Sequence, residues 1–594
     1  MCGIVACLRE NDAVDFLLDG LGRLEYRGYD SAGIAVREAA APQLFVRRAV
    51  GRVDALRAGL ASDRPGASGL GVGHTRWATH GAVTETNAHP HHDCAGDVAV
   101  VHNGIIENAA ELRAELEAVG HRFRSDVDSE VIPHLVEAAR DRGLDLATAV
   151  RAALTRLEGS WAIAVIAGTS DRLVVAANRS PLAVGSGPGG HVVASDVAAL
   201  LAYADEIRVL EDGDVVELNG FVSWTDATGS PMPARAPLAL QWSLADAELD
   251  GFADFMEKEI TEQPAAVERQ LELLVPSVAG GSLLVEAGLP EFDRVRLVGC
   301  GTSLHAATVT ARVLGLVGGF PTELVVASEH AGLVDEPATL TLAFSQSGET
   351  ADVLAALRNA AGPVLAVTNT LHSTLARRAD AVLPCMAGPE IGVAATKTFT
   401  SQVVTGSLFA LAAASRAGRL APADLSALLG MLTGLPERLR RAHEYAGPLA
   451  QVVAALVADA EGFVFVSRAG GMPYASEAAL KLQELSYRWA VAYPAGELKH
   501  GPIALIGKGT PVVAVQGGAA AKLQANLAEM RARGAFLVTA GSEDASLPAP
   551  VVADAPWGPL EAIVPLQHLA RAVALGLGCD VDKPRNLAKS VTVE

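Results

Sequence analysis

The sequence predicts a multidomain chain, with an α+β domain of stacked sheets at the N-terminus and two tandem α/β doubly wound domains behind it. Three observations support this. The 594 residues amount to three or four units of about 150 residues each. Short apolar strands separated by turn residues fill residues 1–220. From about residue 290 the pattern changes to an alternation of strand, loop and helix, which occurs twice.

The N-terminal part is expected to hold more strands than long helices. Strands are predicted at "GIVACL", "AGIAVRE", "GVGHTRWAT", "VAVVHNG", "WAIAVIAG" and "LVVAANRS". Two helical segments, "AVDFLLDGLGRLEY" and "ENAAELRAELEAVG", lie between them. This composition predicts sheets stacked on one another with helices outside.

The C-terminal part is expected to contain two copies of one fold. "RVRLVGCGTSLHAATVTARVLGLVGG" and "TLTLAFSQSGETADVLAALRNA" each run from strand to turn to helix, and "GFVFVSRAGGMPYASEAALKLQEL" and "TPVVAVQGGAAAKLQANLAEM" repeat that plan. Val298 and Ala343 are 45 residues apart, and Val466 and Val513 are 47 apart. We therefore expect domains at 2–220, 280–420 and 450–580, a linker at 221–250, and a C-terminal tail at 581–594.

Composition excludes several classes of protein. Acidic residues outnumber basic ones, 68 to 47, and a net charge of −21 argues against a general nucleic-acid surface. The six cysteines are scattered, without a CxxC pair or metal-ligand spacing, as in a reduced cytoplasmic protein. No apolar run reaches the roughly 20 residues that span a bilayer, and the N-terminus lacks the pattern of a signal peptide. We therefore expect no membrane partner, no nucleic-acid partner and no metal.

Cys2 follows the initiator methionine directly, where chain ends are usually solvated and frayed. If Met1 is removed, Cys2 carries a thiol and a free α-amine, and such an amine titrates near ~7.7–8.0. A nucleophile beside its own base is the N-terminal-nucleophile arrangement. An ordinary buried thiol is the alternative that position alone leaves open.

Three further stretches of this domain suit the hydrolysis of a side-chain amide. Arg76 can grip a carboxylate, Asn103 with Gly104 can form an oxyanion hole, and Asp128 can hold an ammonium group. Each has a structural alternative: a surface arginine, an Asn-Gly turn and a helix-capping aspartate. Together with Cys2 they supply what hydrolysis of glutamine needs.

Two polar loops in the first α/β domain predict a phosphate site. Each follows an apolar strand and opens a helix, where backbone N–H groups and the helix dipole favour an anion. Helix capping by the same hydroxyls is the alternative. The two loops contribute Ser303, Ser345, Gln346, Ser347 and Thr350.

The second α/β domain and the tail hold the remaining candidates. Lys481 and Glu484 are three residues apart on a predicted helix, so they share a face; a solvated ion pair is the alternative. His500 lies in the loop "GELKHGP" and could equally be structural. The tail contains Lys589, which could form a Schiff base with a sugar carbonyl if the tail is ordered.

The segments that carry a family resemblance are, in chain order, "MCGIV", "LEYRGYDSAG", "HTRWATHG", "VHNGIIEN", "CGTS", "SQSGETAD", "EIGVAATK", "ALKLQELSY", "AGELKHGP" and "DVDKPRNLAKSVTVE". With them the chain resembles the glutamine–fructose-6-phosphate aminotransferase (isomerising) family from end to end. The resemblance implies an N-terminal glutaminase and two sugar-isomerase domains that convert fructose 6-phosphate to glucosamine 6-phosphate. It also implies a homodimer or larger homo-oligomer, with no metal or organic cofactor.

The resemblance also implies a role for each candidate. Cys2 is the glutaminase nucleophile, with Asn103 and Gly104 as its oxyanion hole. Arg76 and Asp128 hold glutamine, and Trp77 gates an ammonia channel. Ser303, Ser345, Gln346, Ser347 and Thr350 bind the sugar phosphate, and Val393 and Ala588 offer backbone contacts to the sugar. Lys589 is the Schiff-base lysine, Glu484 moves the proton between C1 and C2 with Lys481 beside it, and His500 opens the sugar ring across a dimer interface.

Some positions depart from the family pattern and keep alternatives open. Ala395 stands where the family usually has serine, and Pro389 where it usually has threonine. These changes could mark a paralogue acting on another keto-sugar phosphate. Other Cys-terminal amidotransferases are less compatible with the polar loops. A sugar-phosphate sensor without activity is less compatible with the acidic charge. A glutaminase with a drifted synthase half is less compatible with the presence of Glu484, His500 and Lys589.

Overall fold

The computed structural model describes residues 2–10, 12–38, 43–78, 81–238, 246, 248–330, 338–358, 360–517 and 520–591. The chain divides into two compact units. Unit 1 comprises residues 2–246 together with residues 588–591, and unit 2 comprises residues 248–587. Each unit is described by itself below.

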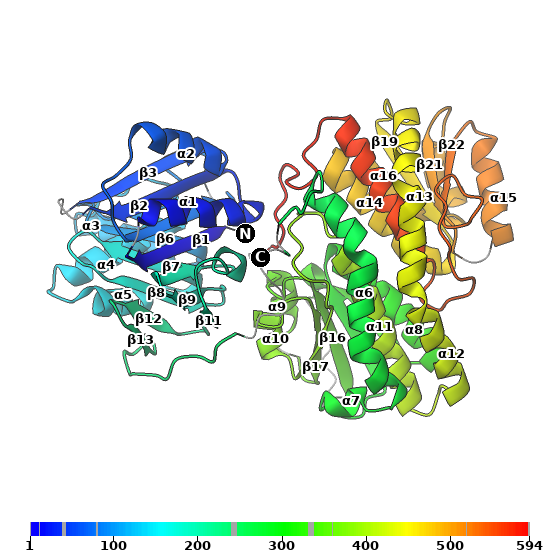
Figure 1. Ribbon diagram of the computed structural model, residues 1–594, viewed down its shortest axis with the longest axis horizontal. Helices are drawn as coiled ribbons and strands as arrows, with labels where there is room; N and C mark the ends of the chain where they lie inside the picture. The colour runs from blue at the N-terminus through cyan, green and yellow to red at the C-terminus, as the bar shows by residue number, and fades with distance from the viewer. Residues whose placement is uncertain are drawn as a thin grey trace. The chain divides into compact units, whose positions relative to one another are not determined.

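Unit 1 is a sandwich of two antiparallel sheets (Figure 1). The first sheet has the order β11 (Glu206–Val209), β9 (Ala183–Gly187), β10 (Gly190–Ala194), β1 (Gly3–Arg9), β4 (Leu70–Arg76), β2 (Ser31–Arg37), β3 (Leu44–Val50). The second has the order β13 (Val222–Thr225), β12 (Val215–Leu218), β8 (Leu173–Asn178), β7 (Gly159–Ala167), β6 (Val98–Ile106), β5 (His91–His92).

Helices cover the outer faces of this sandwich. On the first sheet lie α1 (Ala13–Leu24) and α2 (Val53–Ser62), and on the second lie α4 (Val131–Arg140) and α5 (Leu146–Leu154), with α3 (Ala109–Ala118) beside α4. Short 3-10 turns are η1 (Glu25–Arg27), η2 (Asp128–Glu130) and η3 (Val197–Ala199). Strand β6 shows why the layers hold together, because its residues alternate between two cores. Val98 and Val100 pack against the helices, whereas Ala99 and Val101 pack against the other sheet.

Unit 2 contains two parallel sheets with the same strand order. The first runs β15 (Thr322–Val326), β14 (Arg294–Gly299), β16 (Thr339–Ser345), β17 (Val364–Thr368), β18 (Ala381–Pro384), and the second runs β20 (Trp489–Pro494), β19 (Gly462–Ser467), β21 (Pro511–Val515), β22 (Phe536–Ala540). In both, the first strand of the chain lies between the second and the third. This shared order confirms the prediction of two tandem doubly wound copies, and it sets the polar loops after β14 and β16 at one sheet edge.

The helices of unit 2 are α6 (Phe255–Ala279), α7 (Leu283–Glu286), α8 (Gly301–Gly318), α9 (Ala351–Ala356), α10 (Thr374–Arg378), α11 (Lys397–Arg416), α12 (Pro422–Thr433), α13 (Leu435–Leu456), α14 (Met472–Ser486), α15 (Ala520–Arg531) and α16 (Ile563–Gly576). One large apolar core joins both sheets to most of these helices, while α9 and α10 pack in a smaller core with the first sheet and α15 packs in another with the second. The 3-10 turns are η5 (Ala327–Glu329), η6 (Ala469–Gly471), η7 (Glu497–His500), η8 (Pro502–Leu505) and η9 (Leu560–Ala562). Helix α11 is buried on all sides, as a central helix should be. Within the described residues, no helix is both long enough and apolar enough to cross a membrane.

The structure differs from the sequence prediction in two places in unit 1. Five helices of ten residues or so are present where two were expected; α2, α4 and α5 were missed because their short amphipathic patterns lie close to strand patterns. Strand β13 pairs with β12 inside the segment predicted as a linker. Much of the rest of that segment, residues 239–245 and 247, lies outside the described residues.

The close packing of α8 on α11 depends on a glycine. A Cβ atom at Gly406 would lie 1.9 Å from Oγ1 of Thr310, whose side chain is fully buried on α8. We expect Gly406→Ala to destabilise unit 2 by about 1–3 kcal/mol through overpacking, more than the ~1 kcal/mol that alanine gains in helix propensity. Urea unfolding followed by circular dichroism measures the change. Gly315→Ala is the matched control, since this exposed glycine of α8 has open space around it and the substitution should be neutral or stabilising. Equal effects of the two variants would contradict the packing argument.

Two candidate active sites

The register of β1 on β4 places Cys2 at one end of the first sheet. Gly3 lies opposite Thr75, so the next pair outward brings Cys2 beside Arg76. The backbone N–H of Trp77 donates to Sγ of Cys2 at 3.2 Å. Burial raises the pKa of the Cys2 thiol, and the Trp77 N–H and the charge of Arg76 only partly oppose this. A thiol with a raised pKa needs a base to become a nucleophile, which the free α-amine of a processed Cys2 can supply.

Asn103 on β6 is oriented toward Cys2 by a buried histidine. Nε2 of His74 lies 3.0 Å from Oδ1 of Asn103 and 3.1 Å from the carbonyl oxygen of His102. Both partners are acceptors, so Nε2 carries the proton and donates to them. The amide nitrogen of Asn103 is therefore turned toward Cys2, where it donates to the Cys2 carbonyl oxygen at 2.9 Å. The same NH₂ group has a second hydrogen for a developing oxyanion.

Gly104 follows Asn103 at a position that only glycine can occupy. Its φ is +136°, and a Cβ atom there would lie 2.1 Å from the carbonyl oxygen of Ser160. The residue thus bends β6 next to Asn103 without a steric clash. This geometry is compatible with an oxyanion-hole role for the pair.

Arg76 and Asp128 lie at the same end of the sandwich. Arg76 is buried, which lowers the pKa of its guanidinium, while the charges of Cys2, Asp30 and Asp128 oppose the shift. Asp128 begins η2, and its Oδ2 accepts the backbone N–H of Ile106 at 2.8 Å, two residues after Gly104. Unit 1 thus brings together Cys2, Arg76, Asn103, Gly104 and Asp128.

A row of buried histidines behind this site was missed by the sequence analysis. The rings of His74 and His89 stack at 4.1 Å between centroids, and His89 meets His91 edge-on at 4.4 Å. Burial lowers the pKa of His74 to about 3, and burial likewise lowers the pKa values of His89 and His91 well below the ordinary value. The row is therefore uncharged at neutral pH. The segment "NAHPHH" was visible, but only the packing of β4 on the following loop shows that His89 stacks on His74, the histidine that holds Asn103.

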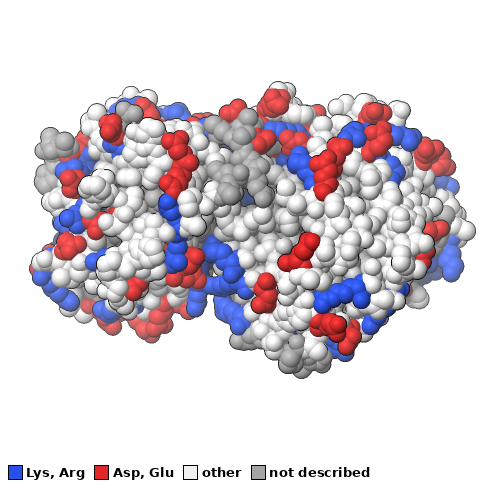
Figure 2. Space-filling model, turned by 60° about the horizontal axis from the view of Figure 1, so that its bottom comes forward, with Lys and Arg blue, Asp and Glu red and all other residues white. Residues whose placement is uncertain are grey.

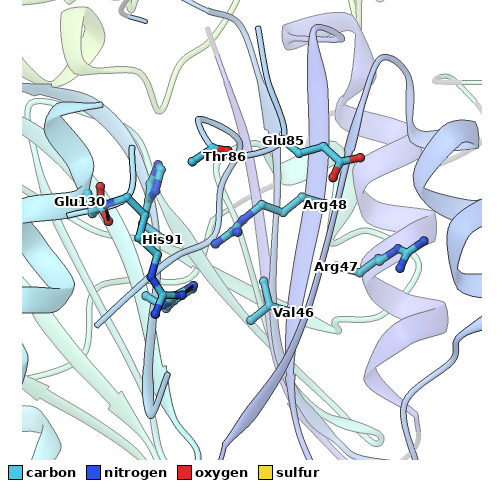
Figure 3. A pocket seen from close by; sticks show the side chains of 9 residues that line it. Val46, Arg47, Arg48, Glu85, Thr86, His91 and Glu130 are labelled. Atoms are coloured by element: carbon cyan, nitrogen blue, oxygen red, sulfur yellow. Dashed lines mark hydrogen bonds between the residues drawn. The ribbon is translucent and has the colours of Figure 1, made fainter. Parts of the chain in front are cut away.

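His91 is also one wall of a polar cavity of about 440 Å³ in unit 1 (Figure 3). Arg48 on β3 extends into the hollow toward His91 and Glu130, whereas Arg47 points away from it. The other lining residues are Val46, Glu85, Thr86, His92 and Arg124. None of the residues that line it is a predicted site residue, so the cavity has no assigned part in glutamine hydrolysis.

In unit 2 the predicted phosphate-binding side chains gather at the ends of β14 and β16. Oγ of Ser345 lies 2.9 Å from Oγ1 of Thr350 and accepts the N–H of Gly348 at 3.0 Å. Gly348 has a φ of +65°, and a Cβ atom there would lie 1.9 Å from Oγ of Ser373, so the tight turn requires glycine. Ser303, in the first turn of α8, accepts a hydrogen bond from Nε2 of Gln402 at 3.1 Å.

The alternative that these hydroxyls cap helices is not what the structure shows. The residue that caps α8 is Cys300, and Thr350, which caps α9, makes no side-chain capping bond. Oγ of Ser347 accepts the backbone N–H of Glu349 at 3.2 Å, while the backbone carbonyl of Gln346 accepts the backbone N–H of Asn369 at 3.2 Å. The hydroxyl groups of Ser345, Ser347 and Thr350 thus bond within the loop's own turn, and their role in binding a ligand stays a prediction.

Lys481 on α14 is a buried cation and not the solvated partner that the alternative reading supposes. Its Nζ lies 2.6 Å from Oε2 of Glu484 and 3.5 Å from Oε1 of Glu477, and it donates to Oγ1 of Thr302 at 3.0 Å. Burial lowers the pKa of Lys481, but the two carboxylates outweigh burial and raise it. Because Thr302 belongs to α8, the second copy of the fold contributes these charges to the loop of the first.

Glu477 is the functional candidate that the sequence analysis missed. It is fully buried, and it accepts from Oγ1 of Thr302 at 2.9 Å and from Nδ1 of His305 at 2.7 Å. Glu477, Lys481 and Glu484 are spaced i, i+4 and i+7, which places all three on one helix face. Extending the predicted pair by one turn would have found it.

The other predicted residues of the sugar site are Val393, His500, Ala588 and Lys589. The N–H of Val393 donates to the carbonyl oxygen of Asp582 at 3.0 Å, and His500 is exposed on η7 without a hydrogen bond or ion pair to another described residue. Ala588 and Lys589 group with unit 1. Their roles beside the sugar residues of unit 2 therefore stay predictions.

Comparison with known families covers both units. Residues 74–202 match the glutamine amidotransferase domain, and residues 289–412 and 461–544 match the SIS domain. Among solved structures, the C-terminal domain of glucosamine-fructose-6-phosphate aminotransferase from Francisella tularensis is similar at 34% identity with a TM-score of 0.53. That comparison covers 57% of this chain and all of the other.

Curated relatives match over the full length. The glutamine–fructose-6-phosphate aminotransferase [isomerizing] of Symbiobacterium thermophilum is 45% identical over 617 residues, and that of Methanothermobacter thermautotrophicus is 44% identical over 614 residues. Both comparisons cover 100% of each chain. With both kinds of domain present in order and a full-length match at this identity, the chain belongs to the isomerizing glutamine–fructose-6-phosphate aminotransferase family.

Proposed function

We propose that this protein converts glutamine and fructose 6-phosphate to glutamate and glucosamine 6-phosphate. Membership of the family and the presence of a glutamine amidotransferase domain and SIS domains support this. The observation that carries the proposal is the pairing of Cys2 with the oriented amide of Asn103 in a chain that also holds the Lys481 charge network.

In unit 1, Cys2 attacks the side-chain amide carbon of glutamine. The α-amine of Cys2, free once Met1 is removed, takes the thiol proton. The negative charge then moves to the amide oxygen, where N–H groups of Asn103 and Gly104 stabilise it. The α-ammonium of Cys2 then gives its proton to the amide nitrogen, and collapse of the tetrahedral intermediate expels ammonia and leaves a thioester, which water hydrolyses to glutamate. Arg76 and Asp128 hold the two charged ends of glutamine, and Trp77, packed edge-on against Tyr29, gates the ammonia.

In unit 2, the hydroxyls at the ends of β14 and β16 bind the sugar phosphate, and His500 helps to open the ring. Lys589 forms a Schiff base at C2, which ammonia then attacks and so displaces the lysine. Glu484 carries a proton between C1 and C2 to complete the isomerisation. Lys481 acts as a positioning residue, because its ion pair with Glu484 holds that carboxylate in place. Val393 and Ala588 supply backbone contacts to the sugar.

The protein is proposed to act as a homodimer or a larger homo-oligomer in the cytoplasm. Helix α13 exposes an apolar stripe of Tyr445, Leu449, Val452 and Leu456, which a second copy could cover. Figure 2 shows a broad uncharged area on the visible face of unit 2. His500, exposed on its own chain, suits a residue given to a partner's site. All six cysteines are free thiols, as expected in a reducing compartment.

A paralogous enzyme acting on another keto-sugar phosphate is the second candidate. Ala395 carries it, since this half-buried residue follows Val393 in the segment between β18 and α11 and lacks the hydroxyl that the family usually has there. The overall reaction would be the same in kind, with a different ketose at the sugar site.

A product assay tests the proposed reaction. Purified protein, with removal of Met1 checked by mass, is given glutamine and fructose 6-phosphate, and both products are quantified. We expect equal amounts of glutamate and amino-sugar phosphate, and neither product from Cys2→Ala. With ammonium replacing glutamine, that variant should still make amino sugar, because its unit 2 is intact. Glutamate without amino sugar would contradict fructose 6-phosphate as the acceptor and lead to tests of other ketose phosphates.

The oxyanion role of Asn103 predicts a selective defect. Asn103→Ala should lower the glutaminase kcat by about 10²–10³-fold, since one preorganised donor is lost. The KM for glutamine should change little, because Arg76 and Asp128 remain, and ammonia-dependent synthesis should be unchanged. A loss confined to KM would instead assign Asn103 to substrate binding.

Restoring the missing hydroxyl tests the substrate of unit 2. If fructose 6-phosphate is the acceptor, Ala395→Ser should lower its KM by about two- to tenfold, equivalent to one hydrogen bond of about 0.5–1.5 kcal/mol. The glutaminase activity of unit 1 serves as the internal control and should stay constant. A KM for fructose 6-phosphate that is higher in Ala395→Ser than in the parent would instead show that alanine is suited to this sugar.

A further inference from the structure

Four side chains of unit 1 that the proposed reaction does not use converge on one point. Their donor atoms, one each from Cys94, His121, His134 and Glu137, all lie within 4.8 Å of one another. Cys94 lies between β5 and β6, His121 follows α3, and the other two share a face of α4. His134 is buried, and the side chains of His121 and Glu137 are only 11% and 13% exposed.

The distances between these atoms match the edges of a metal tetrahedron. Sγ of Cys94 lies 3.7 Å from Nδ1 of His121 and 3.6 Å from Nδ1 of His134, and the latter is 3.3 Å from Oε2 of Glu137. Tetrahedral zinc with ordinary bond lengths has sulfur–nitrogen edges of about 3.6 Å and nitrogen–oxygen edges of about 3.4 Å. The remaining recorded edge, 2.8 Å between His121 and Glu137, is shorter.

A hydrogen-bond network alone explains this cluster poorly. Oε2 of Glu137 faces Nδ1 of His121, Nδ1 of His134 and the backbone N–H of Cys94 at 2.8, 3.3 and 3.3 Å. A carboxylate oxygen offers about two lone-pair sites, so three donors crowd it. The sulfur in turn accepts the backbone N–H of Arg122 at 3.4 Å, as a metal-bound thiolate would.

The chemistry of the four donors selects the ion. One thiolate, two imidazoles and one carboxylate form a mixed sulfur, nitrogen and oxygen set that suits Zn²⁺ and not Mg²⁺ or Ca²⁺. Two anionic and two neutral ligands balance the charge of the ion. Four protein ligands fill a tetrahedral shell, which is typical of a structural site and not of a catalytic one. Glu130, 3.8 Å from Nε2 of His134, lies where a carboxylate supports a ligand histidine.

We propose that Cys94, His121, His134 and Glu137 form a structural zinc site. It ties the β5–β6 connection and the segment after α3 to helix α4. The first of these leads directly into β6 with Asn103 and Gly104, and the second leads into η2 with Asp128. Zinc at this point fixes the positions of β6 and η2, which carry residues of the glutamine site, without touching glutamine.

The sequence analysis expected no metal, because the cysteines show no ligand spacing. The proposed ligands are 27, 13 and 3 residues apart in the chain, and only the last interval resembles a motif. Folding of α4 against the two connections creates the site, so cysteine spacing could not have shown it.

Metal analysis of the full-length protein tests the site. Protein produced with added Zn²⁺ and freed of loosely bound metal should contain about one zinc per chain by mass spectrometry. Apo protein titrated with Co²⁺ should gain the visible bands of tetrahedral cobalt and a thiolate charge-transfer band in the near ultraviolet. Both signals should be lost in Cys94→Ala, and zinc should raise the melting temperature of the parent but not of that variant.

Two variants separate this site from other thiols. Cys579→Ser removes a half-buried thiol of unit 2, and Cys2→Ala removes the nucleophile; both should keep the zinc. Because Cys2→Ala lacks glutaminase activity, failure of the zinc proposal and failure of the reaction proposal are distinguishable. Should Cys94→Ala not fold, zinc protection of Cys94 from alkylation in the parent, located by peptide mass, decides the question. No zinc and no cobalt bands in the parent, or equal zinc in folded Cys94→Ala, would overturn the proposal.

Discussion

The buried cation of Lys481 is the constraint on which unit 2 depends. It carries a charge into a site closed to water, and the attraction of Glu477 and Glu484 offsets that desolvation. Removing one carboxylate would leave Lys481 with a single counter-ion, and removing both would leave its charge unpaired at a cost of about 3–5 kcal/mol. Thr302 extends the network to α8, so the charges of the second fold copy are fixed against the phosphate loops of the first. The second copy of the fold thereby places charged groups beside the polar loop of the first.

Unit 1 reaches a similar rigidity with neutral groups. The register of β1 on β4 fixes Cys2, and uncharged His74 fixes the amide of Asn103. A charged histidine there would add repulsion next to Arg76, and burial prevents it. The geometry of the oxyanion donors is thus set before glutamine binds, which is the condition under which such donors lower a barrier. The proposed zinc site would hold the strands and loops that carry them.

Joining both chemistries in one chain has a physical reason. Ammonia released into neutral water becomes ammonium, which is not a nucleophile. Production of ammonia by the same molecule that consumes it raises the effective concentration of the neutral form. The proposed reaction therefore needs both units intact, even though each has its own sheets, core and polar site.

The sequence by itself determined many of the strands and the local motifs, although α2, α4 and α5 were missed. Short apolar runs specify strands such as β1 and β6, and a strand followed by a polar turn and a helix predicts the sites around Ser303 and Ser345, because these patterns depend on neighbours in the chain. Cys2, Asn103 and Lys481 were recognisable for the same reason. Only the tertiary structure decided that Lys481 is buried against Thr302, that His74 orients Asn103, and that Cys94 meets His121, His134 and Glu137. Each of these contacts joins residues on different elements, and strand register and helix packing, which are properties of the whole fold, determine which side chains meet.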